Sequence, residues 1–340
     1  MSTRLSDYDY DLPRALIAQC PLPRREDSRM MVLHRDEQTI EHARFVDLKR
    51  FLRDGDLLVL NDSRVLPARH FSDDGKLEFL FLEQIAAHRW KALVKPGRRF
   101  GRGANTFIRG VRAQAEETFS DGSREVILDE DIDLLHGGAM PLPPYIKRPS
   151  ITSTSLRTGS DRRFTEEDQA RYQTVFAKYD GSLAAPTAGL HFTPQIVATL
   201  PHSFITLHVG TATFRPVKTK DITQHRMHPE RFFISPAAAT AIIQARRVVA
   251  VGTTTMRVLE SVQRNFGRIQ AGESETNIFI YPPFEFRAVD VLLTNFHLPR
   301  STLLMLVSAF ATREFILRAY DEAVRAQYRF FSYGDCMLIL

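Results

Sequence analysis

The sequence has few cysteines and no long apolar segment. Its 340 residues include only Cys20 and Cys336, too few for a disulfide framework or a four-cysteine zinc site. The longest nearly apolar run, residues 303–311, falls far short of the ~20 residues that cross a bilayer. The first residues are too acidic and polar for a signal or transit peptide. We therefore expect a soluble cytoplasmic protein with no membrane partner.

The common catalytic signatures are also missing. The sequence contains no Walker phosphate-binding motif, no dinucleotide-binding glycine fingerprint, no HExxH zinc motif and no GxSxG nucleophile motif. No single motif therefore names a reaction, and the function has to be inferred from several weaker signals taken together.

The charge is small in total but unevenly distributed. Lysine and arginine number 45 against 40 acidic residues, a formal net charge of +5. Residues 89–112 contain eight basic and no acidic residues, whereas residues 116–133 contain eight acidic residues and one arginine. The basic stretch fits a surface for a phosphate backbone, but it equally fits a solvated hairpin balanced by its acidic neighbour.

The pattern of apolar residues predicts two domains. Residues 65–145 contain short strand-like runs separated by turn residues, which is typical of a small barrel. The flanking segments alternate helices and strands. We therefore predict a mixed α/β fold: a large discontinuous α/β catalytic domain, residues 1–64 and 146–340, with an inserted small all-β, barrel-like domain, residues 65–145. The predicted helices are 43–53, 165–179, 236–246, 255–266 and 301–327; the predicted strands are 56–60, 77–82, 90–94, 105–111, 125–128, 204–209, 232–234, 248–251, 278–281 and 289–293.

Residues 248–261 are the clearest candidate for an anion site. A hydrophobic strand ends at Gly252, threonines including Thr253 and Thr254 follow, and a predicted helix opens with Arg257 in its first turn. Free backbone amides and the helix dipole at such a junction attract a phosphate or carboxylate. Threonine is also a common helix cap, so the same pattern has a purely structural explanation.

Other loops beside predicted strands combine small residues with histidine. Small residues let a ligand approach the backbone, and histidine titrates near neutral pH, although each histidine also fits a packing role. In open α/β sheets, ligands usually bind beyond the carboxyl ends of strands. The candidates are Thr187, Gly189 and His191 in 178–193, His208 in 208–214, Tyr281 in 279–284, Asn295, Phe296, His297 and Arg300 in 294–301, and Asp335 in 328–335.

Residues 225–230 contain three possible metal ligands, His225, His228 and Glu230. Two histidines three residues apart face the same way on a helix, but Pro229 disfavours a helical conformation at His228. No second ligand pair is evident, so we expect no metal site.

In combination, these segments closely resemble the S-adenosylmethionine:tRNA ribosyltransferase-isomerase family of queuosine biosynthesis. No single motif is decisive, but their order along the whole chain is highly specific. The matching segments are YDLP (10–13), DSR (27–29), GDLLVLNDSRVLPAR (55–69), MPLPPYIKR (140–148), AAPTAGLHFT (184–193), HVG (208–210), MHPE (227–230), VGTT (251–254), TNFHLP (294–299) and YGD (333–335).

The resemblance implies a tRNA-modifying enzyme. Such an enzyme transfers the ribosyl part of S-adenosylmethionine to 7-aminomethyl-7-deazaguanine at the tRNA wobble position and isomerises it, which gives epoxyqueuosine and releases adenine and methionine. S-adenosylmethionine is then a consumed co-substrate, no cofactor stays bound, and the partner is the anticodon region of tRNA. We expect a monomer.

This chemistry needs a base to deprotonate the carbon beside the sulfonium and a proton donor for the departing adenine. The catalytic candidates are His191, His208, His228, His297, Glu230 and Asp335. The candidates for substrate binding are Thr187, Gly189, Thr253, Thr254, Arg257, Tyr281, Asn295 and Phe296.

The chain departs from the family pattern in three places: Ala212 stands where glycine is expected, Cys336 where alanine is usual, and the 70–77 connection is short. Two alternative functions stay open. A non-catalytic RNA-binding protein would bind tRNA without consuming S-adenosylmethionine. A metal-dependent hydrolase using His225, His228 and Glu230 would lose activity with a chelator.

Overall fold

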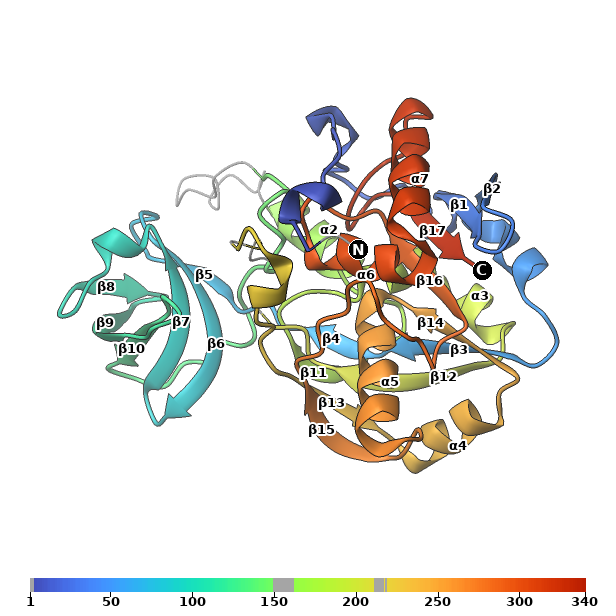
Figure 1. The fold of residues 1–340 in the computed structure, drawn as a ribbon. Helices are drawn as coiled ribbons and strands as arrows, with labels where there is room; N and C mark the ends of the chain where they lie inside the picture. Colours follow the sequence, from blue (N-terminus) through green and yellow to red (C-terminus); the bar gives the residue numbers. More distant parts are fainter. Residues whose placement is uncertain (1–2, 149–161, 211–216, 218) are drawn as a thin grey trace. The chain divides into compact units, whose positions relative to one another are not determined.

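The computed structural model describes residues 3–148, 162–210, 217 and 219–340 (Figure 1). It has a mixed α/β fold with several sheets, as predicted. The chain forms two compact units: Met1–Arg64, Pro144–Ile146 and Gln173–Leu340 make the first, and Val65–Pro143 and Lys147–Tyr172 make the second. Our division into a large domain and an inserted domain at residues 65–145 stays a prediction.

A nine-stranded sheet forms the centre of the first unit, in the order β15-β13-β12-β3-β14-β16-β17-β1-β2. The four strands β12, β3, β14 and β16 are parallel, and the remaining neighbours are antiparallel except for the parallel pair β1 and β17. The strands are β1 Arg29–His34, β2 Thr39–Arg44, β3 Asp56–Asn61, β12 His202–Leu207, β13 Glu230–Ile234, β14 Arg247–Val251, β15 Gly272–Thr276, β16 Val291–Asn295 and β17 Cys336–Ile339. A separate two-stranded sheet pairs β4 Ser63–Val65 with β11 Tyr179–Ser182.

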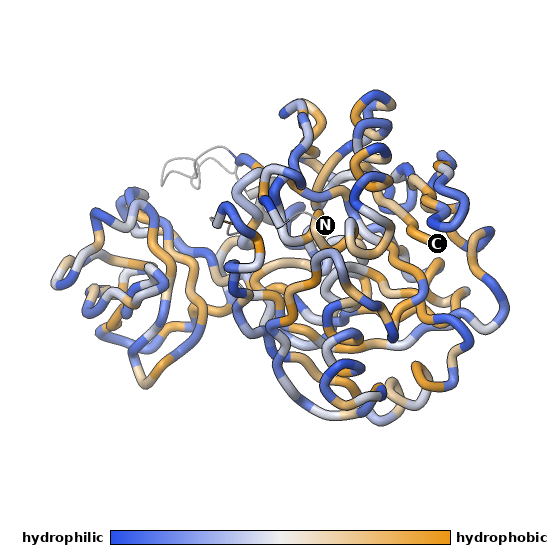
Figure 2. The backbone as a smooth tube through the Cα atoms, viewed as in Figure 1, coloured by the Kyte–Doolittle hydropathy of each residue, from blue (hydrophilic) through white to orange (hydrophobic). Residues whose placement is uncertain are grey.

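Both faces of this sheet are covered, which explains why its central strands are apolar throughout. Alternate residues of a strand point to opposite faces. Val59 and Ala250 thus join one core with the long helices, whereas Leu58 and Val249 join a second core. Figure 2 shows the apolar residues concentrated along these central strands, with polar residues on the outer loops. The helices of the first unit are α3 Pro194–Ala198, α4 Pro236–Gln244, α5 Thr253–Phe266, α6 Thr302–Ala311 and α7 Arg313–Arg325.

Four predicted elements outside the antiparallel sheet of the second unit are wrong or displaced. The predicted helix 43–53 is the end of β2 followed by the 3₁₀ helix η4, Phe45–Phe51. The predicted strand 278–281 is a loop whose apolar side chains pack on the core without a ladder partner. The predicted helix 301–327 is broken at Thr312, where a positive φ of 66° ends α6 and the threonine hydroxyl caps α7. The predicted helix 165–179 ends early, because α2 spans Arg162–Arg171.

The second unit contains a six-stranded antiparallel sheet in the order β5-β6-β7-β10-β9-β8, a half-barrel whose end strands do not pair with each other. Its strands are β5 Arg69–Phe71, β6 Glu78–Ala86, β7 Arg89–Lys95, β8 Asn105–Ile108, β9 Val111–Thr118 and β10 Arg124–Leu128. Its core is rich in aromatic rings, with Phe79 against Phe81 and Phe100, and Phe81 against Trp90. The predicted strands 77–82, 90–94 and 125–128 are therefore confirmed. The predicted strand 105–111 is instead β8 followed by a turn at 109–110, and the prediction lacks β5 and nearly all of β9.

Candidate active site

The carboxyl ends of four parallel strands define one edge of the large sheet. β3, β12, β14 and β16 end there at Asn61, Leu207, Val251 and Asn295. β17 runs antiparallel to β16 and begins opposite Asn295, so the starts of β17 and its parallel neighbour β1 lie at the same edge. Segments distant in the sequence therefore meet where open α/β sheets usually bind ligands.

His191 is the buried centre of a hydrogen-bonded chain at this edge. Its Nε2 lies 3.0 Å from the Asn295 side-chain amide nitrogen, and its Nδ1 lies 2.8 Å from Ser28 Oγ. The amide nitrogen of Asn295 also faces the carbonyl oxygens of Phe331 and Asp335, which identifies it as the donor. The proton of His191 therefore resides on Nδ1. Burial, reinforced by Arg25 and Arg329, lowers the pKa of His191 to about 3.

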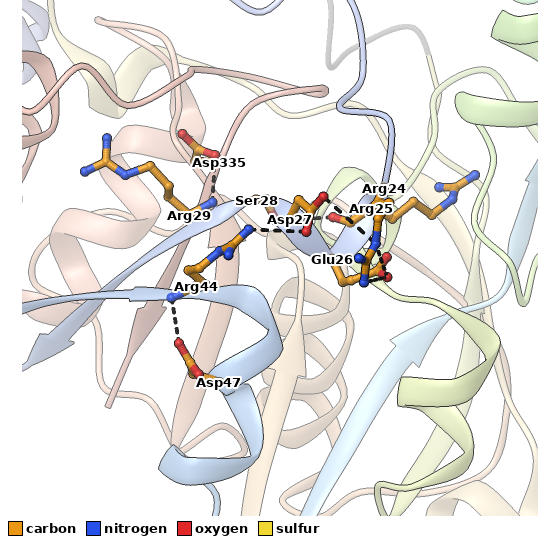
Figure 3. Close-up of polar contacts among 9 residues, drawn as sticks. All are labelled: Arg24, Arg25, Glu26, Asp27, Ser28, Arg29, Arg44, Asp47 and Asp335. Carbon is orange, nitrogen blue, oxygen red and sulfur yellow. Dashed lines mark hydrogen bonds and ion pairs between the residues drawn. The ribbon is translucent and has the colours of Figure 1, made fainter.

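Asp335 lies beside this chain and binds two backbone amides. Its Oδ1 accepts from the Arg29 amide at 2.9 Å (Figure 3). Its Oδ2 accepts from the Arg329 amide at 2.8 Å. Burial raises the pKa of Asp335 despite these bonds. Both carboxylate oxygens are thus engaged in joining the start of β1 to the turn before β17.

His297 is equally buried but more isolated. Its Nε2 lies 3.1 Å from Thr294 Oγ1, and burial lowers its pKa to about 3. Its backbone is held from two sides, because its amide donates to the Tyr320 hydroxyl at 2.9 Å and its carbonyl accepts from the Tyr10 hydroxyl. The imidazole is therefore neutral and rigidly placed at neutral pH.

The start of α5 carries a buried ion pair. Arg257 Nη1 lies 2.5 Å from Glu230 Oε2, and both side chains are at most 4% exposed. Glu230 Oε1 also accepts from the Gly210 amide at 3.3 Å. Gly252, with a positive φ of 92°, precedes the helix and supplies no side-chain cap to its first turn. The segment predicted to bind an anion is thus an uncapped helix start beside a guanidinium group that Glu230 pairs.

His208 follows β12 and is half-buried, with its ring against Gly181, where any added Cβ would lie 2.7 Å from His208 Nδ1. Burial, with a contribution from Arg231, lowers its pKa. Its Nδ1 is buried without a hydrogen-bond partner. His208 is therefore unprotonated at neutral pH, with a buried ring nitrogen that lacks a hydrogen-bond partner.

Unpartnered polar atoms recur along this edge. Buried polar atoms usually have hydrogen-bond partners, and leaving one unpaired costs about 1–3 kcal/mol. Several residues at the strand ends nevertheless carry one, so this edge holds hydrogen-bonding groups that the described residues leave unused. These atoms are His208 Nδ1, Thr254 Oγ1, Arg257 Nη2, Asn295 Oδ1 and Arg329 Nη1.

Two other predicted site residues, Phe296 and Gly189, have clear packing roles. Phe296 is fully buried among Tyr320, Tyr328 and Phe330. A Cβ at Gly189 would lie 2.8 Å from the Phe176 ring, so packing already requires this glycine.

The remaining predicted residues lie in varied surroundings. Tyr281 is partly buried against Phe279, Thr253 is buried in α5, and Thr187 begins the 3₁₀ helix η6, Thr187–His191. Arg300 pairs with Asp9. Ala212 lies outside the described residues.

The three candidate metal ligands do not form a cluster. His228 is exposed, the ring of His225 lies against Phe279, and Glu230 is occupied by Arg257. Among the described residues, no group of three histidine, cysteine, aspartate or glutamate side chains could hold a metal ion. In that same part of the chain, no helix is long and apolar enough to cross a membrane.

The sequence reasoning overlooked the segment of residues 24–29, shown in Figure 3. Arg25 donates to the carbonyls of Leu190 at 3.1 Å and Gln173 at 2.9 Å, and thereby fixes the segment that carries His191. Ser28 contacts His191 itself. The DSR motif at 27–29 was the available signal, because it belongs to the family pattern although it names no chemistry.

Gly334 provides a test of how tightly this edge is packed. A Cβ there would lie 2.4 Å from the Arg329 carbonyl oxygen and 2.6 Å from the Phe330 carbonyl carbon, both backbone atoms that cannot rotate away. We expect Gly334→Ala to lower the free energy of unfolding by about 2 kcal/mol, measured by urea denaturation. Gly101→Ala, which has open space around it, should leave stability nearly unchanged. Equal effects would contradict the packing argument.

The buried histidines predict an acid-sensitive stability. In the unfolded chain, His191 and His297 have pKa values near 6.5, whereas in the folded protein both are about 3. Between these values the unfolded chain binds protons that the folded protein does not, so stability falls as the pH drops below about 6.5. Each histidine contributes up to about 1.4 kcal/mol per pH unit. Urea denaturation at several pH values between roughly 6.5 and 4.5 should show a shallower dependence for His297→Gln, and an unchanged slope would contradict the assignment.

Comparisons with known proteins agree with one another and extend over nearly the whole chain. The family model for queuosine biosynthesis proteins matches residues 5–339. An S-adenosylmethionine:tRNA ribosyltransferase-isomerase of Desulforamulus reducens is 45% identical, with 99% of this chain and 100% of the relative covered. One of Moorella thermoacetica is 47% identical, with 99% and 100% covered. The crystal structure of an S-adenosylmethionine tRNA ribosyltransferase of Thermotoga maritima superposes with a TM-score of 0.54 at 37% identity, over 98% of this chain and 100% of that one.

Proposed function

The chain belongs to the queuosine biosynthesis protein family as an S-adenosylmethionine:tRNA ribosyltransferase-isomerase, and we propose that it acts on tRNA carrying 7-aminomethyl-7-deazaguanine at the wobble position. The ribosyl part of S-adenosylmethionine is transferred to this base and isomerised, which gives epoxyqueuosine and releases adenine and methionine. The observation that carries the proposal is the match to relatives of this name over 99% of the chain.

The first chemical step requires a base. The positive sulfonium of S-adenosylmethionine acidifies the adjacent ribose carbon, so a neutral side chain with an available lone pair can remove its proton. Both ring nitrogens of His191 are engaged, and Nε2 of His297 is engaged by Thr294. His208 has a lowered pKa and an unpartnered Nδ1. Among the histidine candidates, this favours His208 as the base.

The start of α5 suits the carboxylate of the methionine part. Arg257 Nη2 and Thr254 Oγ1 are donors without protein partners, and the helix dipole favours a negative charge beside them. Glu230 holds the guanidinium in place through Nη1. Water has to be kept away from the unsaturated intermediates that follow deprotonation, which suits an edge where most candidate side chains are buried.

The remaining predicted roles belong to the same proposal. His191, His228, His297, Glu230 and Asp335 stay candidates for the proton donor to adenine, and Thr187, Gly189, Thr253, Tyr281, Asn295 and Phe296 stay candidates for substrate contacts. S-adenosylmethionine is consumed as a co-substrate with no bound cofactor, the tRNA anticodon region is the partner, and the enzyme works as a cytoplasmic monomer.

One assay tests the proposal. Purified protein is incubated with S-adenosylmethionine and tRNA carrying the deazaguanine, and adenine and methionine are quantified by chromatography. We expect equal amounts of both, dependent on the modified tRNA, with unmodified tRNA as the control.

Other outcomes would identify a different function. Tight tRNA binding without adenine release would indicate a non-catalytic RNA-binding protein. Activity abolished by a chelator and restored by a divalent metal would indicate the hydrolase alternative. Either result would overturn the proposed reaction.

A further inference from the structure

The basic residues of the stretch 89–112 fall into two sets. The first set is engaged locally, because each side chain pairs with an acidic group of the same unit or donates to a backbone carbonyl. Its members are Arg89 with Glu125 at 2.7 Å, Lys91 with Asp121 at 3.5 Å, Arg102 with Glu116 at 3.5 Å, Arg112 with Asp129 at 3.9 Å, and Arg109 with the Asp133 carbonyl at 2.9 Å. Most of the basic stretch is therefore engaged by contacts within its own unit.

The second set lies at one turn and is not neutralised. Lys95 ends β7, and Arg98 and Arg99 lie in the 3₁₀ helix η5, Gly97–Arg99, that follows it. All three are exposed, and no described acidic group lies within 4.0 Å of their charged nitrogens. We call these three residues the η5 turn. Its positive charge is available to a partner.

Hydrogen bonds from Arg124 and Phe100 fix the backbone of the η5 turn. Arg124 donates from Nε to the Phe100 carbonyl at 3.2 Å and from Nη2 to the Gly97 carbonyl at 3.3 Å. The Phe100 side chain is fully buried in the aromatic core, and its amide donates to the Gly97 carbonyl at 3.1 Å. Within the described part of the chain, Arg124 donates its hydrogen bonds to carbonyl groups, so its charge adds to that of the turn. The backbone that carries Arg98 and Arg99 is thus preorganised.

From this arrangement we propose that the η5 turn binds backbone phosphates of the tRNA substrate. The inference rests on the proposed function, which supplies tRNA as the partner. Exposed cations without acidic neighbours lose no ion pair when they meet a phosphate, whereas the paired cations would have to exchange one. Arginine suits this role because its planar guanidinium can bind two phosphate oxygens at once. A preorganised backbone also lowers the entropy lost on binding.

The test compares two double variants of equal charge. Arg98→Gln/Arg99→Gln removes two unpaired cations, and Arg102→Gln/Arg112→Gln removes two paired cations from the same unit. Binding of the modified tRNA is measured by fluorescence anisotropy between roughly 50 and 200 mM salt. The first variant should bind about tenfold more weakly near 100 mM salt, and its logarithmic salt slope should be shallower by about 1.8. The control should lose less than about twofold in affinity. Thermal unfolding should be unchanged in both.

The outcomes separate this inference from the proposed function. A wild-type chain that releases adenine, together with an Arg98→Gln/Arg99→Gln variant of unchanged salt slope, would overturn the phosphate contact alone. Equal losses in both double variants would assign the binding to total charge and would also overturn it. A wild-type chain that neither binds tRNA nor releases adenine would overturn the proposed function itself. Unchanged tRNA binding with lost binding of polyglutamate would assign the turn to an acidic protein partner instead.

Discussion

Glu230→Gln should lower the free energy of unfolding by about 3 kcal/mol, because it leaves the buried Arg257 guanidinium without a counter-charge. The two side chains are 2% and 4% exposed, so water cannot solvate the remaining cation. Arg257→Met should be destabilising for the opposite reason, since it leaves a buried carboxylate that keeps its hydrogen bond from the Gly210 amide but loses its cation. Urea denaturation measures both effects.

The double variant shows whether the loss comes from the broken pair. Glu230→Gln/Arg257→Met removes both charges, and we expect it to be clearly more stable than the sum of the single changes, because neither charge is left alone. Additive losses within about 0.5 kcal/mol would contradict the pairing argument.

The same variants separate structure from substrate binding. If Arg257 Nη2 binds the methionine carboxylate, the double variant should raise the KM for S-adenosylmethionine even where it is fully folded. Glu230→Gln, which keeps the guanidinium, should have a smaller effect on KM. A normal KM in the folded double variant would remove Arg257 from the carboxylate site.

The edge that the candidate residues share could be predicted from sequence because strand polarity decides it. The apolar runs of β3, β14 and β16 are followed by polar residues, and parallel strands place their carboxyl ends at one edge. Residues as distant as His191, Thr253 and Asn295 therefore share this edge. Four of the ten family motifs agree with that placement, because they contain or follow the ends of β3, β12, β14 and β16.

The roles of individual residues could not be predicted, because they depend on contacts between distant segments. Asp335 looked like a free acid in the sequence, but its oxygens bind the amides of Arg29 and Arg329. His191 looked like a base, but Ser28 and Asn295 engage both of its nitrogens. Such partners lie up to 306 residues apart in the chain, and spacing carries no information about them.

The prediction of secondary structure failed where tertiary packing overrode the local sequence pattern. Residues 278–281 form a short apolar run like that of a strand, yet Ile280 is buried as part of a loop packed on the core. No glycine or proline marks the helix break at Thr312 in the sequence. A single residue with positive φ separates α6 from α7 there, and both flanking segments are individually good helices.

His208→Asn should reduce the rate constant for adenine release by about 100-fold to 10,000-fold, the range that a lost general base usually costs. The expectation follows from three properties of this side chain: its place just beyond β12, its lowered pKa and its unpartnered Nδ1. The imidazole is half-buried and beside Gly181, so asparagine fits the space and stability should change little. His136→Asn is the matched control, because His136 is exposed in the second unit and has no proposed role in the reaction.

The pH profile distinguishes a base from a positioning group. Burial keeps the pKa of His208 below 6.5, so in the wild type kcat/KM should be flat near neutrality and fall as the pH drops through that lowered pKa, where the base becomes protonated. The residual activity of His208→Asn should lose this acidic limb. A variant that keeps the full rate, or keeps the limb while the rate falls, would remove His208 as the base. A large loss in His228→Asn instead would move the proton transfer to the exposed loop before β13.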